Sequence, residues 1–163
     1  EPPAVPSGTD IDYPRDPQTL ALFDLAHEGA TPESDPEAWD AWRTSRITLL
    51  LEEIRGAVKE VRPETVLSAA VGSEPERALE HFQDSEDWLA RGLVDAIYPM
   101  NYTADRELFE RRVAAWQERA RDVELVMGVL VGSGDLDARL EEIQHARAEL
   151  GALCIFGVIA LLE

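Results

Sequence analysis

Short, continuously apolar runs alternate with helix-length segments, and this alternation constrains the fold more than any other feature. The runs are VLSAAV at 66–71, LVMGVLV at 125–131 and ALCIFGV at 152–158. They lack the polar alternation of strands with one face in water, and parallel strands that are covered on both faces have this pattern. Strands that alternate with long helices indicate an α/β fold. We therefore predict an α/β protein with parallel strands.

The predicted elements follow one another regularly along the chain. Strands are predicted at 8–13, 66–71, 94–99, 124–131 and 152–158. Helices are predicted at 37–61, 76–91, 105–121 and 135–150. Asp35 is the expected N-cap of the first helix, with Pro36 at its first position, and Gly92 is the expected end of the second. Residues 18–35 are predicted as a long loop with a helical turn at 20–26.

Two architectures fit this order. A doubly wound sheet of five strands would be complete at 163 residues, whereas a (β/α)8 barrel needs about 250 residues. A doubly wound sheet reverses its strand order midway, and a barrel does not. The alternation alone leaves both architectures open: five strands in sequential order, curved as an arc of a barrel, or a sheet whose strand order reverses.

The charge of the chain excludes some classes of partner. Asp and Glu number 33 against 15 Lys and Arg, which gives a net charge of −18. This charge repels phosphate backbones and anionic lipids, so we expect no nucleic-acid partner. No segment reaches the roughly 18 apolar residues of a membrane span. His27, His81 and His145 are scattered without ligand spacing, so we expect no metal and no cofactor.

The cysteine and the tryptophans are predicted to be structural. Cys154 is the single cysteine, and its apolar neighbours predict a buried thiol that forms no intramolecular disulfide. Trp88 and Trp116 are predicted in the core. Trp39 and Trp42 lie three residues apart on one predicted helix, and this spacing favours packing over a sugar platform.

Three sequence stretches resemble a known family. They are GTDIDYPRDP at 8–17, QDSEDWL at 83–89 and GLVDAIYPMNYT at 92–103. These motifs resemble glycosyl hydrolase-like family ten, bacterial TIM-barrel proteins of the extracellular glycosidase kind. The resemblance implies that residues 1–163 are a single incomplete barrel domain, about strands four to eight. It also implies an extracellular, periplasmic or lipoprotein-anchored protein whose targeting signal lies outside this chain.

The resemblance also implies where the acid lies. Asp12 matches the family's acid, and Asp10 stands where the family has a histidine. Residues two apart on a strand face the same side, with alpha carbons roughly 6.5–7 Å apart. Glycosidases use two carboxylates, about 5–5.5 Å apart in retaining enzymes and about 6.5–9.5 Å apart in inverting ones. We therefore expect Asp12 to be the acid/base or nucleophile, assisted by Asp10. A solvated strand end and a divalent-cation site are the alternatives.

The predicted substrate-binding residues are Tyr13, Arg15, Met100, Asn101 and Tyr102. The first two follow the expected acid, and the other three follow the strand at 94–99. An amide and a phenol can hold sugar hydroxyls, and a tyrosine ring can stack on a sugar. The alternatives are a surface arginine at Arg15 and an ordinary turn in which Asn101 bonds the backbone.

The resulting expectation is a glycoside hydrolase that acts on a bacterial or environmental polysaccharide. The second carboxylate is not assigned, and Asp105 is one candidate for it. The rival functions are a non-catalytic carbohydrate-binding barrel and a complete doubly wound binding domain. An incomplete barrel would expose two strand edges, so we also expect self-association.

Overall fold

The computed structural model describes residues 13–103, 105–130 and 152–156, together with residues 140, 143–144 and 147–148. The predicted strand at 8–13 lies outside these residues except for Tyr13, which is not in a strand. Most of the predicted helix at 135–150 also lies outside them. The five positions described between 140 and 148 are all helical, as predicted.

The described part begins with a helix that the sequence analysis treated mainly as a loop. Helix α1 spans Pro17–Ala26 and is preceded by Asp16, whose carboxylate accepts a hydrogen bond from the Thr19 amide at 3.0 Å. A capping carboxylate followed by proline at the first helical position starts a helix readily. Phe23 then fixes α1 to the next helix, because its ring is fully buried there. The helical turn predicted at 20–26 is thus part of a longer helix, and the loop predicted at 18–19 is wrong.

Helix α2 confirms the prediction for 37–61. It spans Pro36–Val61, and the Asp35 side chain accepts from the Ala38 amide at 3.0 Å. The rings of Trp39 and Trp42 stack with centroids 5.3 Å apart, and both meet the Phe23 ring edge-on. The two tryptophans are packing residues, as their spacing predicted.

The single helix predicted at 76–91 is wrong, because the structure has two short helices there. Strand β1 spans Ser68–Val71, and helices α3 (Pro75–Glu80) and α4 (Ser85–Ala90) follow it. Between them Phe82 has a φ of 61°, a left-handed conformation that interrupts a helix. Asp84 then caps α4 by accepting from the Asp87 amide at 3.1 Å. The chain ends this unit at Gly92, whose φ is also 61°, as predicted.

The remaining elements lie close to their predicted positions. They are β2 (Ala96–Pro99), α5 (Arg106–Arg119), β3 (Glu124–Leu125), β4 (Met127–Leu130) and β5 (Leu153–Phe156). The single strand predicted at 124–131 is divided at Val126, so that β3 and β4 belong to two sheets. One sheet has the order β1-β2-β3 and the other pairs β4 with β5.

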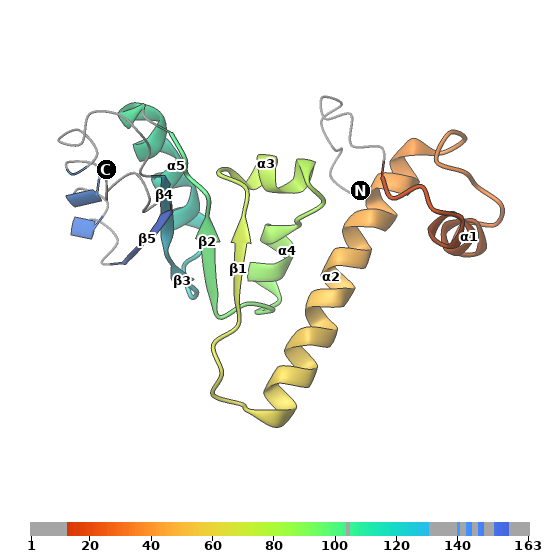
Figure 1. Ribbon diagram of the computed structural model, residues 1–163, viewed down its shortest axis with the longest axis horizontal. Helices are drawn as coiled ribbons and strands as arrows, with labels where there is room; N and C mark the ends of the chain where they lie inside the picture. Colours follow the sequence, from red (N-terminus) through yellow and green to blue (C-terminus); the bar gives the residue numbers. More distant parts are fainter. Residues whose placement is uncertain are drawn as a thin grey trace.

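All described strand pairs are parallel, and they follow the order of the chain. Ser68 pairs with Ala96, which pairs with Glu124, and an isolated parallel bridge between Met100 and Gly128 joins β2 to β4. The described strands therefore lie in the sequence β1, β2, β3/β4, β5 without the reversal of a doubly wound sheet (Figure 1). The predicted parallel α/β class is confirmed.

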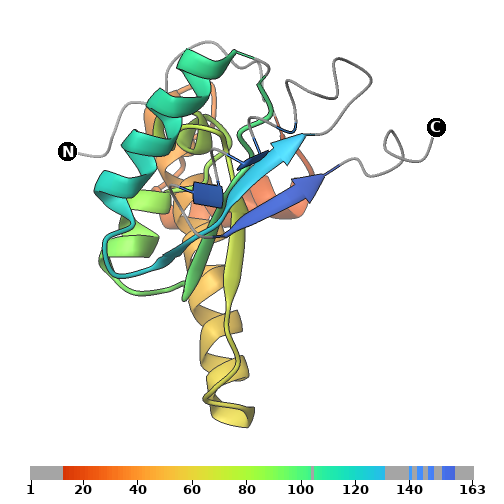
Figure 2. The same ribbon diagram turned by 90° about the vertical axis from the view of Figure 1, so that its left-hand side faces the viewer.

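The main core lies between the strands and the helices that connect them. Figure 2 shows α4 and α5 on the same side of the strands. The core residues from the strands are Val71, Ile97, Met127 and Val129, and Trp88 and Trp116 join them from α4 and α5, as predicted. Helix α2 packs on α4, where Trp88 Nε1 donates to Thr48 Oγ1 at 2.9 Å (Figure 1).

The opposite face of the sheet has a different environment. Side chains alternate between the faces of a strand, so Gly128, Cys154 and Phe156 point away from the helices that cover Met127 and Val129. Cys154 is exposed, and the predicted buried thiol is wrong. Its apolar neighbours indicated burial because the sequence does not show that this face of β5 is left uncovered by the described helices. None of the described helices combines the length and apolar character that a bilayer crossing requires.

Candidate functional site

The carboxyl ends of parallel strands are where α/β proteins place their ligands. Met100, Asn101 and Tyr102 directly follow β2 and lie at this end. Asp10 and Asp12 lie outside the residues that the structure describes. Tyr13 is exposed, and Arg15 pairs with Glu33 at 2.5 Å.

Backbone hydrogen bonds hold the segment after β2 on both sides. The Met100 amide donates to the Val71 carbonyl at 3.0 Å, and the Asn101 amide donates to the Gly128 carbonyl at the same distance. The segment is thus tied to β1 and to β4. This places the side chains of Met100 and Tyr102, both more than a third exposed, at a fixed position beyond the strands.

Asn101 is not arranged as the sequence analysis expected. Its side chain is fully buried, with Nδ2 donating to the Phe109 carbonyl at 3.2 Å. Its Oδ1 accepts from Arg112 Nη1 at 3.3 Å. Both the nitrogen and the oxygen of the amide therefore form hydrogen bonds within the protein. This arrangement is close to the alternative interpretation, in which Asn101 bonds the backbone of an ordinary turn. Asn101 holds the segment in place and presents no polar atom to a ligand in this conformation.

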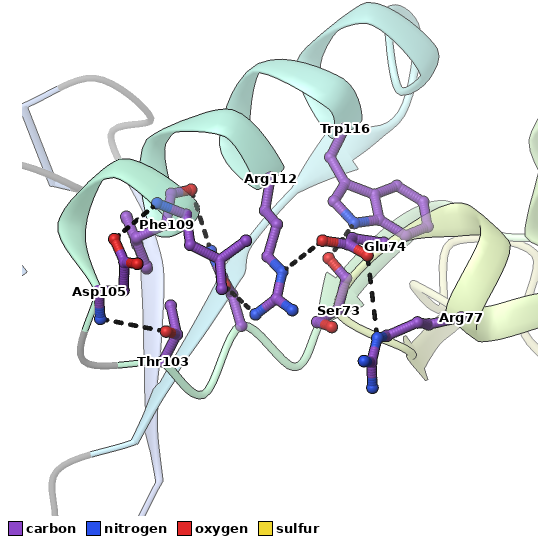
Figure 3. A network of polar contacts seen from close by, with 10 residues as sticks. Ser73, Glu74, Arg77, Thr103, Asp105, Phe109, Arg112 and Trp116 are labelled. Atoms are coloured by element: carbon purple, nitrogen blue, oxygen red, sulfur yellow. Dashed lines mark hydrogen bonds and ion pairs between the residues drawn. The ribbon is translucent and has the colours of Figure 1, made fainter.

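A polar network joins Asn101 to the loop after β1 (Figure 3). Arg112 in α5 donates through Nε to Glu74 at 2.9 Å, and Arg77 lies 3.8 Å from the same carboxylate. Trp116 Nε1 donates to the Ser73 carbonyl at 3.0 Å (Figure 3). Helix α5 thereby connects the segments that follow two neighbouring strands.

The carboxylates of the described strand ends are already in use. Glu74, after β1, pairs with Arg112. Asp105, the expected candidate for a second catalytic carboxylate, caps α5 by accepting from the Leu108 amide at 3.0 Å (Figure 3). Among the residues that the structure describes, no group of three or more His, Cys, Asp or Glu could hold a metal ion.

Tyr102 reaches across the sheet to a residue that the sequence analysis did not select. Its ring stacks on Phe156 at the end of β5, with centroids 5.7 Å apart and an interplanar angle of 23°. Burial raises the pKa of the Tyr102 phenol, and charge repulsion from the neighbouring Cys154 adds to this increase. The signal for Phe156 was its position in the last predicted strand, at 152–158, and only the parallel strand order connects this strand with Tyr102.

The segment after the expected acid is fixed to α2 by Arg43. Arg43 is buried, and its Nη1 donates to the Tyr13 carbonyl at 2.7 Å. The same guanidinium lies 4.0 Å from the centroid of the Phe82 ring and 5.1 Å from that of Trp39. Asp40 on the same helix is its ion-pair partner. Helix α2 therefore determines where the chain lies one residue after Asp12.

The pocket between α2 and the segment of α3 and α4 does not coincide with the described strand ends. A cavity of about 320 Å³ lies between α2 and the α3–α4 segment, where Thr48, Glu52, Asp84 and Arg91 contribute to its walls. Parallel α/β proteins bind ligands beyond the strands, so we place the candidate site at Tyr102 instead.

These features define a parallel α/β protein whose candidate site lies beyond the carboxyl ends of its strands. The family model of Glycosyl hydrolase-like 10 matches residues 12–142, so the chain belongs to this glycosyl hydrolase-like family. The matched stretch includes Asp12, Arg15 and Tyr102, and it ends before Phe156. No curated protein matches the chain.

Proposed function

We propose that this protein is a glycoside hydrolase in which Asp12 is the acid/base or nucleophile and Asp10 assists it. The observation that carries the proposal is the match of Glycosyl hydrolase-like 10, which begins at Asp12 and includes the segment that the structure fixes after β2. Tyr13, Arg15, Met100 and Tyr102 would contact the sugar, and Asn101 would position Met100 and Tyr102.

The chemistry follows from what glycosidic cleavage requires. One carboxylic acid protonates the leaving oxygen, while a carboxylate attacks the anomeric carbon or activates water. Two aspartates separated by one residue can supply this pair, because a like charge beside an acid favours its protonated form. Arg43 supports the arrangement by holding the Tyr13 carbonyl at 2.7 Å.

We further propose that the strands belong to a (β/α)8 barrel, as about its strands four to eight. Their sequential parallel order and the position of α4 and α5 on one face support this assignment. The protein would act on a bacterial or environmental polysaccharide outside the cytoplasm. Exposed strand edges would favour self-association, and sedimentation velocity at several concentrations tests this expectation.

A non-catalytic carbohydrate-binding barrel is the second candidate. This candidate is favoured because two carboxylates at the described strand ends already form structural contacts: Glu74 pairs with Arg112, and Asp105 caps α5. In that case the protein would hold a saccharide at Tyr102 without cleaving it.

One experiment separates the two candidates. Reducing-end release and binding are measured with a panel of oligosaccharides for the unchanged protein, Asp12→Asn and Asp122→Asn. Asp122 is exposed and serves as the control for loss of one negative charge. We expect Asp12→Asn to lower turnover by orders of magnitude with binding retained, and Asp122→Asn to change neither. Near-normal turnover of Asp12→Asn would falsify the catalytic assignment. Binding without cleavage by the unchanged protein would establish the second candidate.

A further inference from the structure

Two exposed aromatic rings meet on the sheet face that the connecting helices leave uncovered. Tyr102 comes from the segment after β2 and Phe156 from the end of β5, so β4 lies between their strands. The exposed fractions of the two residues are 38% and 61%. Their rings stack at 5.7 Å. Large apolar side chains that gather on a surface usually mark a binding site.

A glycine in β4 gives the Tyr102 ring its position. A Cβ atom at Gly128 would lie 3.5 Å from Cε1 of Tyr102 and 3.0 Å from the Pro99 carbonyl oxygen. The absence of a side chain therefore lets the ring lie close over β4. With a larger residue at 128, the atoms beyond Cβ would compete with the ring for this space. The stacked pair therefore involves three strands: β2 through Tyr102, β4 through Gly128 and β5 through Phe156.

We propose that Phe156 and Tyr102 form an aromatic platform that binds one pyranose ring of a neutral saccharide. The proposal rests on the proposed action on carbohydrates and names a residue and a substrate class for it. The C–H groups on one face of a pyranose pack on an aromatic ring, and this contact removes apolar surface of both from water. Phe156 offers the larger exposed surface, while Tyr102 supports it and carries a hydroxyl for a sugar oxygen.

The charge of the protein selects among saccharides. A net charge of −18 repels chains of uronic or sulfated sugars. The platform itself is built from one phenyl and one phenol ring, with Gly128 beneath and the Cys154 thiol nearby. Burial keeps the Tyr102 phenol protonated by raising its pKa further above neutral pH. A platform of this composition fits an uncharged pyranose.

The test measures affinity by titration calorimetry with the Asp12→Asn protein, which leaves the ligand intact. The probes are neutral hexamers of glucose, xylose and N-acetylglucosamine, with a galacturonic acid hexamer as the charged comparison. Phe156→Ala, Phe156→Leu and Phe156→Trp are compared with Leu25→Ala, which removes an exposed apolar side chain from α1. Thermal unfolding of each variant reports whether it folds.

We expect a neutral hexamer to bind and Phe156→Ala to weaken it about tenfold or more, because burying roughly 55 Å² of apolar surface corresponds to a factor of ten. Phe156→Leu keeps an apolar side chain without the flat ring and should also bind more weakly. The affinity of Phe156→Trp should lie within about threefold of that of the Asp12→Asn protein without a second substitution. Leu25→Ala should leave this affinity unchanged.

The outcomes distinguish this inference from the proposed function. If a hexamer binds and Phe156→Ala and Phe156→Leu bind it as tightly as the parent, the platform is wrong while carbohydrate binding stands. Tighter binding of the galacturonic acid hexamer overturns the neutral class. If no hexamer binds to the parent, both the platform and the action on carbohydrates are rejected.

Discussion

The Arg43 guanidinium in α2 donates a 2.7 Å hydrogen bond to the carbonyl oxygen of Tyr13, the residue after the proposed catalytic acid. The same group lies 4.0 Å from the centroid of the Phe82 ring. A buried cation over an aromatic face is worth about 2 kcal/mol. Arg43 therefore connects three separate parts of the chain, namely α2, the segment after Asp12 and the turn between α3 and α4.

We predict that Arg43→Met lowers the free energy of unfolding by about 2 kcal/mol, because a hydrogen bond and cation–π contacts are lost. It should also lower turnover, since the segment after Asp12 loses its anchor. Arg43→Lys should restore little, because lysine lacks the planar fork. Urea unfolding and reducing-end release measure the two effects. Arg46→Met is the control, because Arg46 on the same helix is exposed and its guanidinium lies 5.4 Å from the centroid of the Trp42 ring, so this variant loses only an exposed cation–π contact. Equal effects of both substitutions would contradict the prediction.

Periodicity and capping signals were sufficient for much of the fold. The spacing of apolar residues predicted α2 and α5 to within two residues, and Asp35 with Pro36 marked the start of α2. The parallel strands were predictable because continuously apolar runs between helices are typical of parallel strands that are covered on both faces. The same signal, a capping aspartate followed by proline, marks the start of α1 at Asp16 and Pro17.

Tertiary contacts decided what the sequence could not show. The helix predicted at 76–91 breaks at Phe82, where the ring packs on Arg43, nearly forty residues away in the sequence. Asn101 was expected to contact substrate because it belongs to the family motif after a strand. The sequence does not show that α5 buries its side chain. Phe156 became a site residue only when the strand order brought it to Tyr102.

Asp95 should make the stability of the protein depend on acid pH. The Leu67 amide, with Lys59 and Arg55 beside it, lowers the pKa of the Asp95 carboxyl well below its ordinary value. A lowered folded-state pKa adds stability above the unfolded-state pKa of about 3.9, and this stability is lost as pH falls through the folded-state pKa. Asp95→Asn should therefore cost about 1–2 kcal/mol at pH 7, with a smaller difference at pH 3.

Urea unfolding of both proteins between pH 7 and pH 2 measures this dependence. Glu64→Gln removes an exposed carboxylate from the loop before β1 and serves as the control. An energetic difference between Asp95→Asn and the unchanged protein that stays constant from pH 7 to pH 2 would show that charge is not responsible.

Two glycines should respond in opposite directions to the same substitution. Gly56 is exposed in α2, and a Cβ there meets nothing within 4 Å. Gly56→Ala should raise stability by about 0.5–1 kcal/mol, because alanine is the better helix former. At Gly72 a Cβ would lie 2.6 Å from the Ala78 amide nitrogen. Gly72→Ala should lower stability by about 1–3 kcal/mol, because packed backbone must move. Thermal unfolding of the two variants measures both changes in stability. A stabilising effect of Gly72→Ala would contradict the close packing of α3 on the residue that follows β1.

Asn101 provides the sharpest distinction between a positioning residue and a ligand contact. Its amide joins the Phe109 carbonyl to Arg112 with no exposed surface. Asn101→Ala should lower the free energy of unfolding by about 2 kcal/mol, because the Phe109 carbonyl and the partly buried Arg112 guanidinium each lose a hydrogen bond. Gln117→Ala, at an exposed position of α5, should change stability by less than about 0.5 kcal/mol.

A double-mutant cycle with Arg112→Met isolates the contact between the two side chains. Residues in one hydrogen-bonded network couple by about 0.5–3 kcal/mol, so the double variant should lose less stability than the sum of the single variants. Saccharide affinity of Asn101→Ala should fall only through the displaced Tyr102, and Tyr102→Ala added to it should weaken binding little further. If Asn101→Ala unfolds like the unchanged protein and yet fails to bind a hexamer, the amide contacts the sugar directly. The buried arrangement would then be one of two states of the segment after β2.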